Sequence, residues 1–114
     1  MSERFTITIS FTTSPAPTVT ASPESVSIDY GQQGVIQLTL STQVRGAVFA
    51  ANPVLWDGQP PPGVSVNRVN DYQAQIIATD RDSATTGYSF RAQVGYNGQT
   101  YQSPDPVIIE KGGP

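Results

Sequence analysis

The sequence has 114 residues and a net charge of −3 at neutral pH, and it contains neither cysteine nor histidine. These absences exclude thiol redox enzymes, cysteine proteases, zinc fingers and any catalytic triad that uses imidazole as its base. Only 13% of the residues are charged, with one lysine and five dispersed arginines. We therefore expect binding neither to nucleic acid nor to an anionic membrane, since both need a basic surface.

The length corresponds to one domain, which we place at residues 1–110, followed by a flexible tail at 111–114. Ten prolines and ten glycines are spread along the chain, and no window repeats apolar residues at helical spacing. The N-terminal segment is too polar for a signal peptide, and no segment reaches transmembrane length. The expected location is therefore cytoplasmic, or outside the cell by a route without a signal.

Apolar residues that alternate with threonine and serine predict the first strand, from Phe5 to Phe11. Prolines at positions 15 and 17 end it, because proline cannot donate to a strand ladder. A continuous run of small apolar residues, Ala47 to Ala51, predicts a central strand that is buried on both faces. The other expected strands are 18–21, 26–28, 36–40, 54–56, 64–66, 72–78 and 107–110.

Residues 86–103 predict a β-hairpin, because Asn97-Gly98 supplies the two positive-φ residues of a two-residue type I′ turn. In this register Tyr96 faces Gln99, Val94 faces Tyr101 and Ala92 faces Ser103. The register separates an apolar face from a polar one, and a slip of one residue would invert that separation. The apolar face holds Tyr88, Phe90, Ala92, Val94, Tyr96 and Tyr101; the polar face holds Arg91, Gln93, Thr100 and Gln102.

About eight or nine short strands with regular turn signals predict an all-β fold, an antiparallel β-sandwich of two sheets. The strands Phe5–Phe11 and Val107–Glu110 carry no lysine, the residue that commonly protects exposed sheet edges. Such edges are either covered within the fold or paired with another copy, and in the second case we expect a homodimer through them. The partner would then be the protein itself or another protein.

Two known families resemble parts of the sequence. The segment that begins at Ser22-Pro23 resembles the first strands of bacterial immunoglobulin-like domains, and PPGVSV, YQAQIIATD and TGYSFRAQV are similar to the putative-Ig repeats of bacterial surface proteins. This resemblance covers about residues 22–110 and implies an immunoglobulin-like sandwich with Tyr88 at a tyrosine corner. An adhesin role does not follow, because the tandem repeats of those proteins are missing. The ending PDPVIIEKGGP is also similar to the small bacterial DP-EP family of unknown function, although the Glu-Pro motif is missing.

One candidate binding site centres on Trp56, near the proline cluster at 60–62. An exposed tryptophan there would stack on a sugar ring or a proline-rich peptide, with hydrogen bonds from Asp57, Gln59 and Asn67. The alternative is that Trp56 belongs to the core and that the prolines cover its edge. The aromatic residues grouped with Trp56 in this candidate site are Tyr30 and Tyr72.

A second candidate is a calcium site at one end of the sandwich, because loop carboxylates at alternate positions can face one ion. Asp80 and Asp82 would be its centre, with Asp71, Asp29 or Asp105 as further ligands. The alternative is that aspartate is simply favoured in turns and that Arg81 pairs with a neighbour. We expect no other cofactor, and few charges are available to form the carboxylate pair of a glycosidase.

The sequence thus predicts a non-catalytic β-sandwich that acts in protein–protein association or self-assembly, in a bacterial or phage setting. The alternative is a carbohydrate-binding module centred on Trp56, whose exposure distinguishes the two.

Overall fold

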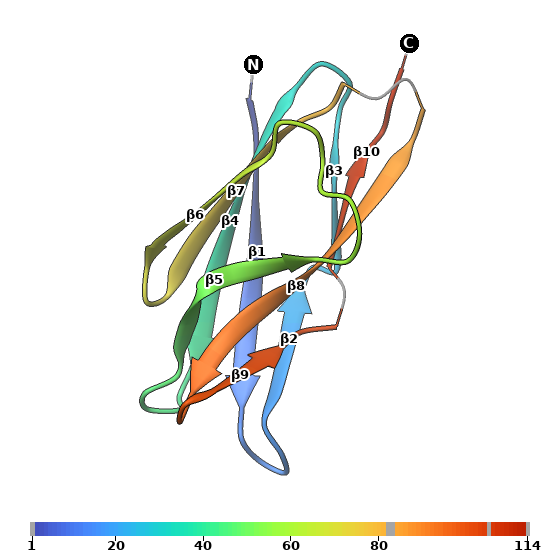
Figure 1. Cartoon of the computed structure of the whole chain (residues 1–114). Helices are drawn as coiled ribbons and strands as arrows, with labels where there is room; N and C mark the ends of the chain where they lie inside the picture. Colours follow the sequence, from blue (N-terminus) through green and yellow to red (C-terminus); the bar gives the residue numbers. More distant parts are fainter. Residues whose placement is uncertain (1, 82–83, 105, 114) are drawn as a thin grey trace.

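The computed structural model describes residues 2–81, 84–104 and 106–113. It is a β-sandwich 46 Å long in which two sheets face each other, so the predicted all-β sandwich is confirmed (Figure 1). No helix within these residues has the length and apolar character needed to cross a bilayer. The strands are β1 Ser2–Thr12, β2 Thr18–Ser22, β3 Ser25–Ile28, β4 Gln33–Thr42, β5 Val48–Trp56, β6 Ser65–Asn70, β7 Gln73–Thr79, β8 Thr86–Tyr96, β9 Gln99–Gln102 and β10 Val107–Glu110.

The sheets are mixed rather than purely antiparallel. The first has the order β2-β1-β4-β7-β6, and the second has the order β3-β10-β8-β5, with β9 also paired to β8. Two pairs, β1 with β4 and β3 with β10, are parallel. A parallel pair needs a long connection, and β2 and β3 supply it between β1 and β4 as the chain crosses to the second sheet. The expectation of an entirely antiparallel sandwich is therefore wrong.

The core lies between the sheets and comes from every second residue of the strands, as the alternating pattern predicts. Phe11, Phe49 and Phe90 are its largest side chains, and each is at most 1% exposed. Aromatic packing extends the core at one end, where Phe11 lies 5.5 Å from Tyr96 and 5.6 Å from Tyr101 between ring centroids. The chain has no cysteine, so these apolar contacts act without help from disulfides.

The predicted hairpin is confirmed. Tyr96 pairs with Gln99 and Val94 with Tyr101, and Asn97 and Gly98 have φ values of 56° and 79°. Beyond the paired residues, the amide of Ser103 donates to the carbonyl of Ala92 at 3.0 Å. Turn chemistry and side-chain alternation both select this register.

Of the two alternatives for the unprotected strands, the structure shows covered edges, for all of β10 and for part of β1. β10 lies between β3 and β8, and β1 lies between β2 and β4 over residues 8–11. Residues 2–7 of β1 pair with β4 alone, and Thr12 pairs with β2 alone. The expectation that Ala47–Ala51 is buried on both faces is wrong, because residues 48–51 belong to β5 at the margin of its sheet, where Ala51 is exposed.

The hairpin turn can be tested with two glycines of the same hairpin. Gly98→Ala should lower the free energy of unfolding by about 1–2 kcal/mol, because a Cβ at positive φ clashes with the backbone. Gly95→Ala should cost no stability, because its Cβ would meet only the Val48 carbonyl oxygen at 3.8 Å. Chemical denaturation of both variants measures the difference, and equal stabilities would contradict the type I′ turn.

Candidate functional site

Trp56 is neither fully buried nor a free platform. It ends β5, is half-buried, and packs its ring on Phe90, with centroids 5.5 Å apart at an angle of 59°. The next residue, Asp57, is held by Arg91, whose Nε lies 3.2 Å from Oδ1. The site residues nearest to Trp56 therefore already have partners within the fold.

The three aromatic residues expected around one ligand lie apart. Tyr72 immediately precedes β7, whereas the turn that holds Tyr30 is bonded beyond the other end of β7, where the Gly31 amide donates to the Asp80 carbonyl at 2.9 Å. Gln59 lines a depression with residues 60–64 and Tyr88, which does not include Trp56. A single platform built from Trp56, Tyr30 and Tyr72 is thus not formed.

The aspartates of the predicted calcium site are also dispersed. Asp80 is fully buried, and its Oδ2 accepts a hydrogen bond from the Gly112 amide at 2.9 Å, which ties residues just after β10 to the end of β7. Asp71 lies at the opposite end of β7. Asp82 and Asp105 lie outside the described residues. Within the part of the chain that the structure describes, no three acidic side chains gather as metal ligands.

Asp29 forms an exposed ion pair with Lys111 at the end of the sandwich where both termini lie (Figure 1). Lys111 Nζ is 2.7 Å from Asp29 Oδ1, and the Asp29 amide donates to Glu3 Oε1 at 2.8 Å. The hydrogen bond from Lys111, and then its charge, lower the pKa of Asp29 below the ordinary 3.8. The same contact raises the pKa of Lys111 above 10.5. A cation is thus already present beside this carboxylate.

This ion pair predicts a pH dependence. Because the pKa of Asp29 is depressed in the folded state, its stabilising effect is present above pH 3.8 and is lost as the pH falls through the folded-state value. NMR titration should find the Asp29 midpoint below 3.8 in the wild type and in Lys111→Arg. In Lys111→Gln the midpoint should return toward 3.8, and an unchanged midpoint there would contradict the pairing.

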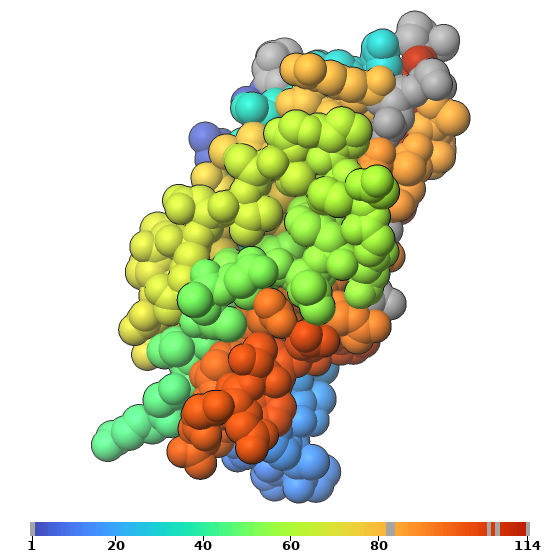
Figure 2. Space-filling model, in the orientation of Figure 1, coloured from blue at the N-terminus to red at the C-terminus, as the bar shows by residue number. Residues whose placement is uncertain are grey.

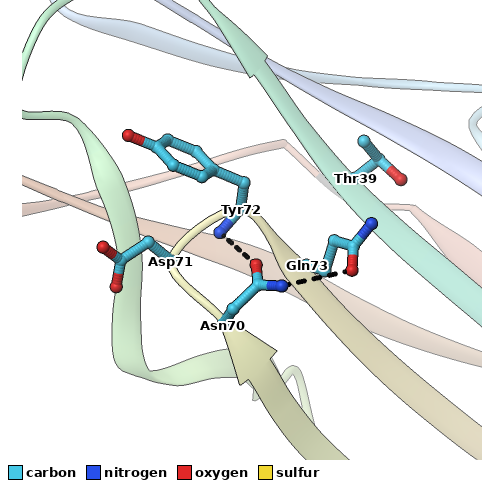
Figure 3. Close-up of a pocket in the computed structure, with 5 residues that line it drawn as sticks. All are labelled: Thr39, Asn70, Asp71, Tyr72 and Gln73. Carbon is cyan, nitrogen blue, oxygen red and sulfur yellow. Dashed lines mark hydrogen bonds between the residues drawn. The ribbon is translucent and has the colours of Figure 1, made fainter.

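The turn between β6 and β7 is the most organised surface feature. Asn70 Oδ1 accepts a hydrogen bond from the Tyr72 amide at 2.9 Å, and Asn70 Nδ2 donates to Gln73 Oε1 at 3.3 Å (Figure 3). An asparagine side chain that accepts a hydrogen bond from the amide two residues later forms an Asx turn, which holds the backbone in a tight turn.

Two neighbouring strands clamp this turn from outside. The Phe49 amide of β5 donates to the Asp71 carbonyl at 2.8 Å, and the Leu40 amide of β4 donates to the Tyr72 carbonyl at 2.8 Å. β4 and β5 belong to different sheets, so the turn is fixed relative to both.

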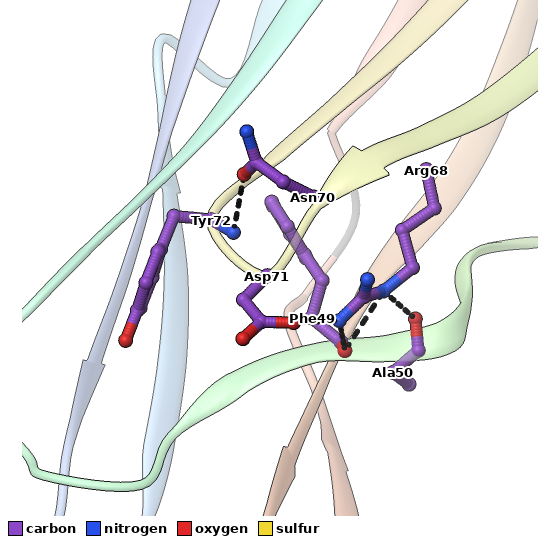
Figure 4. A network of polar contacts seen from close by, with 6 residues as sticks. All are labelled: Phe49, Ala50, Arg68, Asn70, Asp71 and Tyr72. Atoms are coloured by element: carbon purple, nitrogen blue, oxygen red, sulfur yellow. Dashed lines mark hydrogen bonds and ion pairs between the residues drawn. The ribbon is translucent and has the colours of Figure 1, made fainter.

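Arg68 of β6 completes the clamp. Its guanidinium donates to the carbonyls of Phe49, at 3.0 Å from Nη2, and of Ala50, at 3.2 Å from Nε (Figure 4). Nη2 is also 2.9 Å from Asp71 Oδ1. Two carbonyls at the margin of β5 are thereby satisfied by a side chain of the other sheet, so this part of β5 cannot pair with a further strand.

The clamped turn presents its side chains to solvent. Tyr72 and Val69 are each 50% exposed. Thr39, Asn70, Asp71, Tyr72 and Gln73 line an open depression, in which the amide of Gln73 turns toward Thr39 (Figure 3). The Tyr72 ring and the Asp71 side chain point to the other side of the turn, away from Gln73 and Thr39 (Figure 3).

Sequence reasoning named Tyr72 and Asp71 but missed their setting. Asn70-Asp71 is itself a turn signal and would have placed Tyr72 in a turn instead of a strand. Nothing in the sequence shows that Thr39 and Arg68 meet this turn, because those contacts join strands of separate segments.

Comparisons with known proteins give no family for this chain. No family model matches it, and no curated protein is similar to it at a significant level. Its function must be inferred from its own residues.

The clamp can be tested by removing its guanidinium. Arg68→Ala should lower the free energy of unfolding by about 1–3 kcal/mol, since carbonyl groups at the margin of β5 lose their donor. Hydrogen exchange should accelerate at Phe49, Asp71 and Tyr72. Arg45→Ala removes an exposed arginine from the turn between β4 and β5 and should leave exchange unchanged. Equal effects of the two substitutions would show that Arg68 does not hold the turn.

Proposed function

We propose that this chain is a non-enzymatic association module, acting in the cytoplasm, whose partner is a second copy of itself. The observation that carries the proposal is the outer edge of β6. This strand is the edge strand of the first sheet, and no other strand of the described chain pairs with its outer side. Its residues lie at the left margin of the molecule in Figure 2.

The composition of β6 supports pairing. The strand contains neither proline nor lysine, and its four exposed residues, Ser65, Asn67, Val69 and Asn70, are uncharged. Its one charged side chain, Arg68, is directed to the carbonyls of β5. Exposed edges that lack protective charges are templates for another strand.

Other margins of the sheets are better protected. β2 is short and has prolines on both sides, at 17 and 23. β5 contains Pro53 and is capped in part by Arg68. The one-sided part of β1 carries Glu3 and Arg4, two charges that hinder edge pairing. β3 and β9 also lie at margins of the second sheet, but each has only four residues, whereas β6 has six. β6 is therefore the margin that we assign to the partner.

The charges on β6 allow a second copy to pair with this edge. In an antiparallel pair with its two-fold axis at Val66, Ser65 of one copy faces Asn67 of the other, and Arg68 faces Val64, so that no like charges meet. The register shift between Arg68 and Asn70 then ends the regular edge. Because each copy uses its one β6, this pairing closes as a dimer.

An immunoglobulin-like classification is part of the proposal. It is supported by the strand orders β4-β7-β6 and β5-β8-β10, which agree with the BED and CFG orders of such sandwiches. β1 departs from that pattern because it runs parallel to β4. A carbohydrate module centred on Trp56 is not adopted, since its ring packs on Phe90.

Light scattering on a size-exclusion column tests the pairing. The wild type at micromolar concentration should have twice the chain mass of 12.2 kDa. The double variant Ser65→Lys/Asn67→Lys should elute as a monomer, because lysines of the two copies would face each other directly.

The matched control is Thr18→Lys/Thr20→Lys, which adds the same charge to exposed positions of the β2 edge. It should remain dimeric. A wild type that is monomeric throughout the micromolar range would refute self-association. A dimer that survives the β6 substitutions would refute the assigned edge.

A further inference from the structure

We infer that Asn97, in the turn between β8 and β9, is a modification site at which the chain converts its own side-chain amide into aspartate and isoaspartate. The reaction consumes water, is promoted by hydroxide and releases ammonia, and it requires neither an enzyme nor a cofactor. It takes place in the hairpin and leaves the edge of β6 unchanged, so the inference does not rest on self-association.

The main-chain amide of Gly98 is the nucleophile that lies next to the Asn97 side chain. Tyr96 and Gln99 form the last pair of the ladder, so the Gly98 amide lies outside it, and both turn residues are exposed. A Cβ on Gly98 would meet no atom within 4 Å, so the space beside this residue is open. Because the nucleophile and the carbonyl belong to adjacent residues, the reaction is intramolecular and does not pay for bringing two molecules together.

The turn lies at an end of the second sheet. β5 pairs with β8 only as far as Gly95, and beyond it the hairpin is held by its own ladder. Such a hairpin tip opens more readily than the middle of a strand, and opening lets the Asn97 main chain rotate until Cγ meets the Gly98 nitrogen. The residues that line the adjoining depression, 46, 48–51 and 95–100, carry no charge. They supply no general base, so hydroxide must remove the amide proton.

The reaction has two steps and balances without an oxidant or a reductant. The deprotonated Gly98 nitrogen forms a bond with Asn97 Cγ, the Cγ–Nδ2 bond breaks, and ammonia leaves with a proton from water, so that a five-membered succinimide ring remains. Water then opens this ring at one of its two carbonyl carbons. Attack at Cγ restores the ordinary main chain with aspartate at position 97, whereas attack at the main-chain carbonyl leaves the chain running through Cγ, as isoaspartate.

The other asparagines of the chain lack these features. Asn52 precedes Pro53, whose nitrogen has no proton to lose. Asn67 lies within the ladder of β6, opposite Gln75. The side chain of Asn70 is held by two hydrogen bonds, one from the Tyr72 amide and one to Gln73. They serve as three internal controls in one molecule.

The isoaspartate product does not fit the hairpin. A two-residue type I′ turn needs positive φ at both positions, here 56° and 79°, and isoaspartate adds one carbon to the main chain of this turn. The turn determines the register, which places Tyr96 and Tyr101 on Phe11. Conversion to isoaspartate therefore loosens this end of the sandwich.

The test is incubation of the folded protein in mildly alkaline buffer, followed by digestion and mass spectrometry. The peptide that contains Asn97 should gain one mass unit, as aspartate and isoaspartate in separate chromatographic peaks, at a rate that rises with hydroxide concentration. Peptides with Asn52, Asn67 and Asn70 should keep their masses. Asn97→Gly should abolish the gain without changing the fold, because Gly-Gly also forms a type I′ turn.

The effect on the hairpin is measured by hydrogen exchange at Val94 and Tyr101. Exchange should be faster in the purified isoaspartate protein than in the variant Asn97→Asp, which has the same charge and an ordinary main chain. The inference is overturned if Asn97 keeps its amide, or if Asn67 or Asn70 converts sooner. Equal exchange in the isoaspartate protein and Asn97→Asp would overturn the assigned effect on the turn.

Discussion

The contact of Arg68 with β5 is the constraint on which the surface of this protein depends. One guanidinium joins β6 of the first sheet to two carbonyls of the second, and it also binds the turn that follows β6. Part of the β5 margin is closed by this contact, and the ring of Tyr72 is held in solvent by the clamped turn. The outer edge of β6 stays open because its arginine is directed inward. A single side chain thus decides which margin is protected and which remains available.

The open edge is compatible with a stable fold because the core is built without it. Buried residues alternate along β1, β4, β7 and β8, so the two sheets hold each other through apolar contacts between their inner faces. Gly34 shows how closely these elements approach, since a Cβ there would lie 2.5 Å from the Ile28 side chain. At the end near the termini, the buried carboxylate of Asp80 accepts from the Gly112 amide. The chain after β10 is thereby bonded to the first sheet.

Local chemistry made part of this structure predictable. Asn97-Gly98 determines both a turn and a register, and alternation determines the inner faces of β1 and β4. The parallel pairing of β1 with β4 was not predictable, because it depends on where the chain crosses between sheets, and alternation looks the same in either strand direction. The small apolar residues of β5 predicted a central strand, but β5 lies at the margin of its sheet, where Arg68 covers part of it instead of another strand. For the site, Tyr72 could be named from its type, but Leu40, whose amide holds the Tyr72 carbonyl, comes from a distant strand.

The open edge of β6 and the outer face of the first sheet have a joint consequence for the proposed dimer. A two-fold axis that pairs antiparallel strands stands perpendicular to the sheet, so both copies present the same face on the same side. Pairing through β6 would therefore join the outer faces of the two first sheets into one continuous surface. Two weak sites on one surface bind a polymer with higher apparent affinity, because the second contact becomes intramolecular. Self-association would thus raise the apparent affinity of this surface for a repetitive partner without any new contact in either copy.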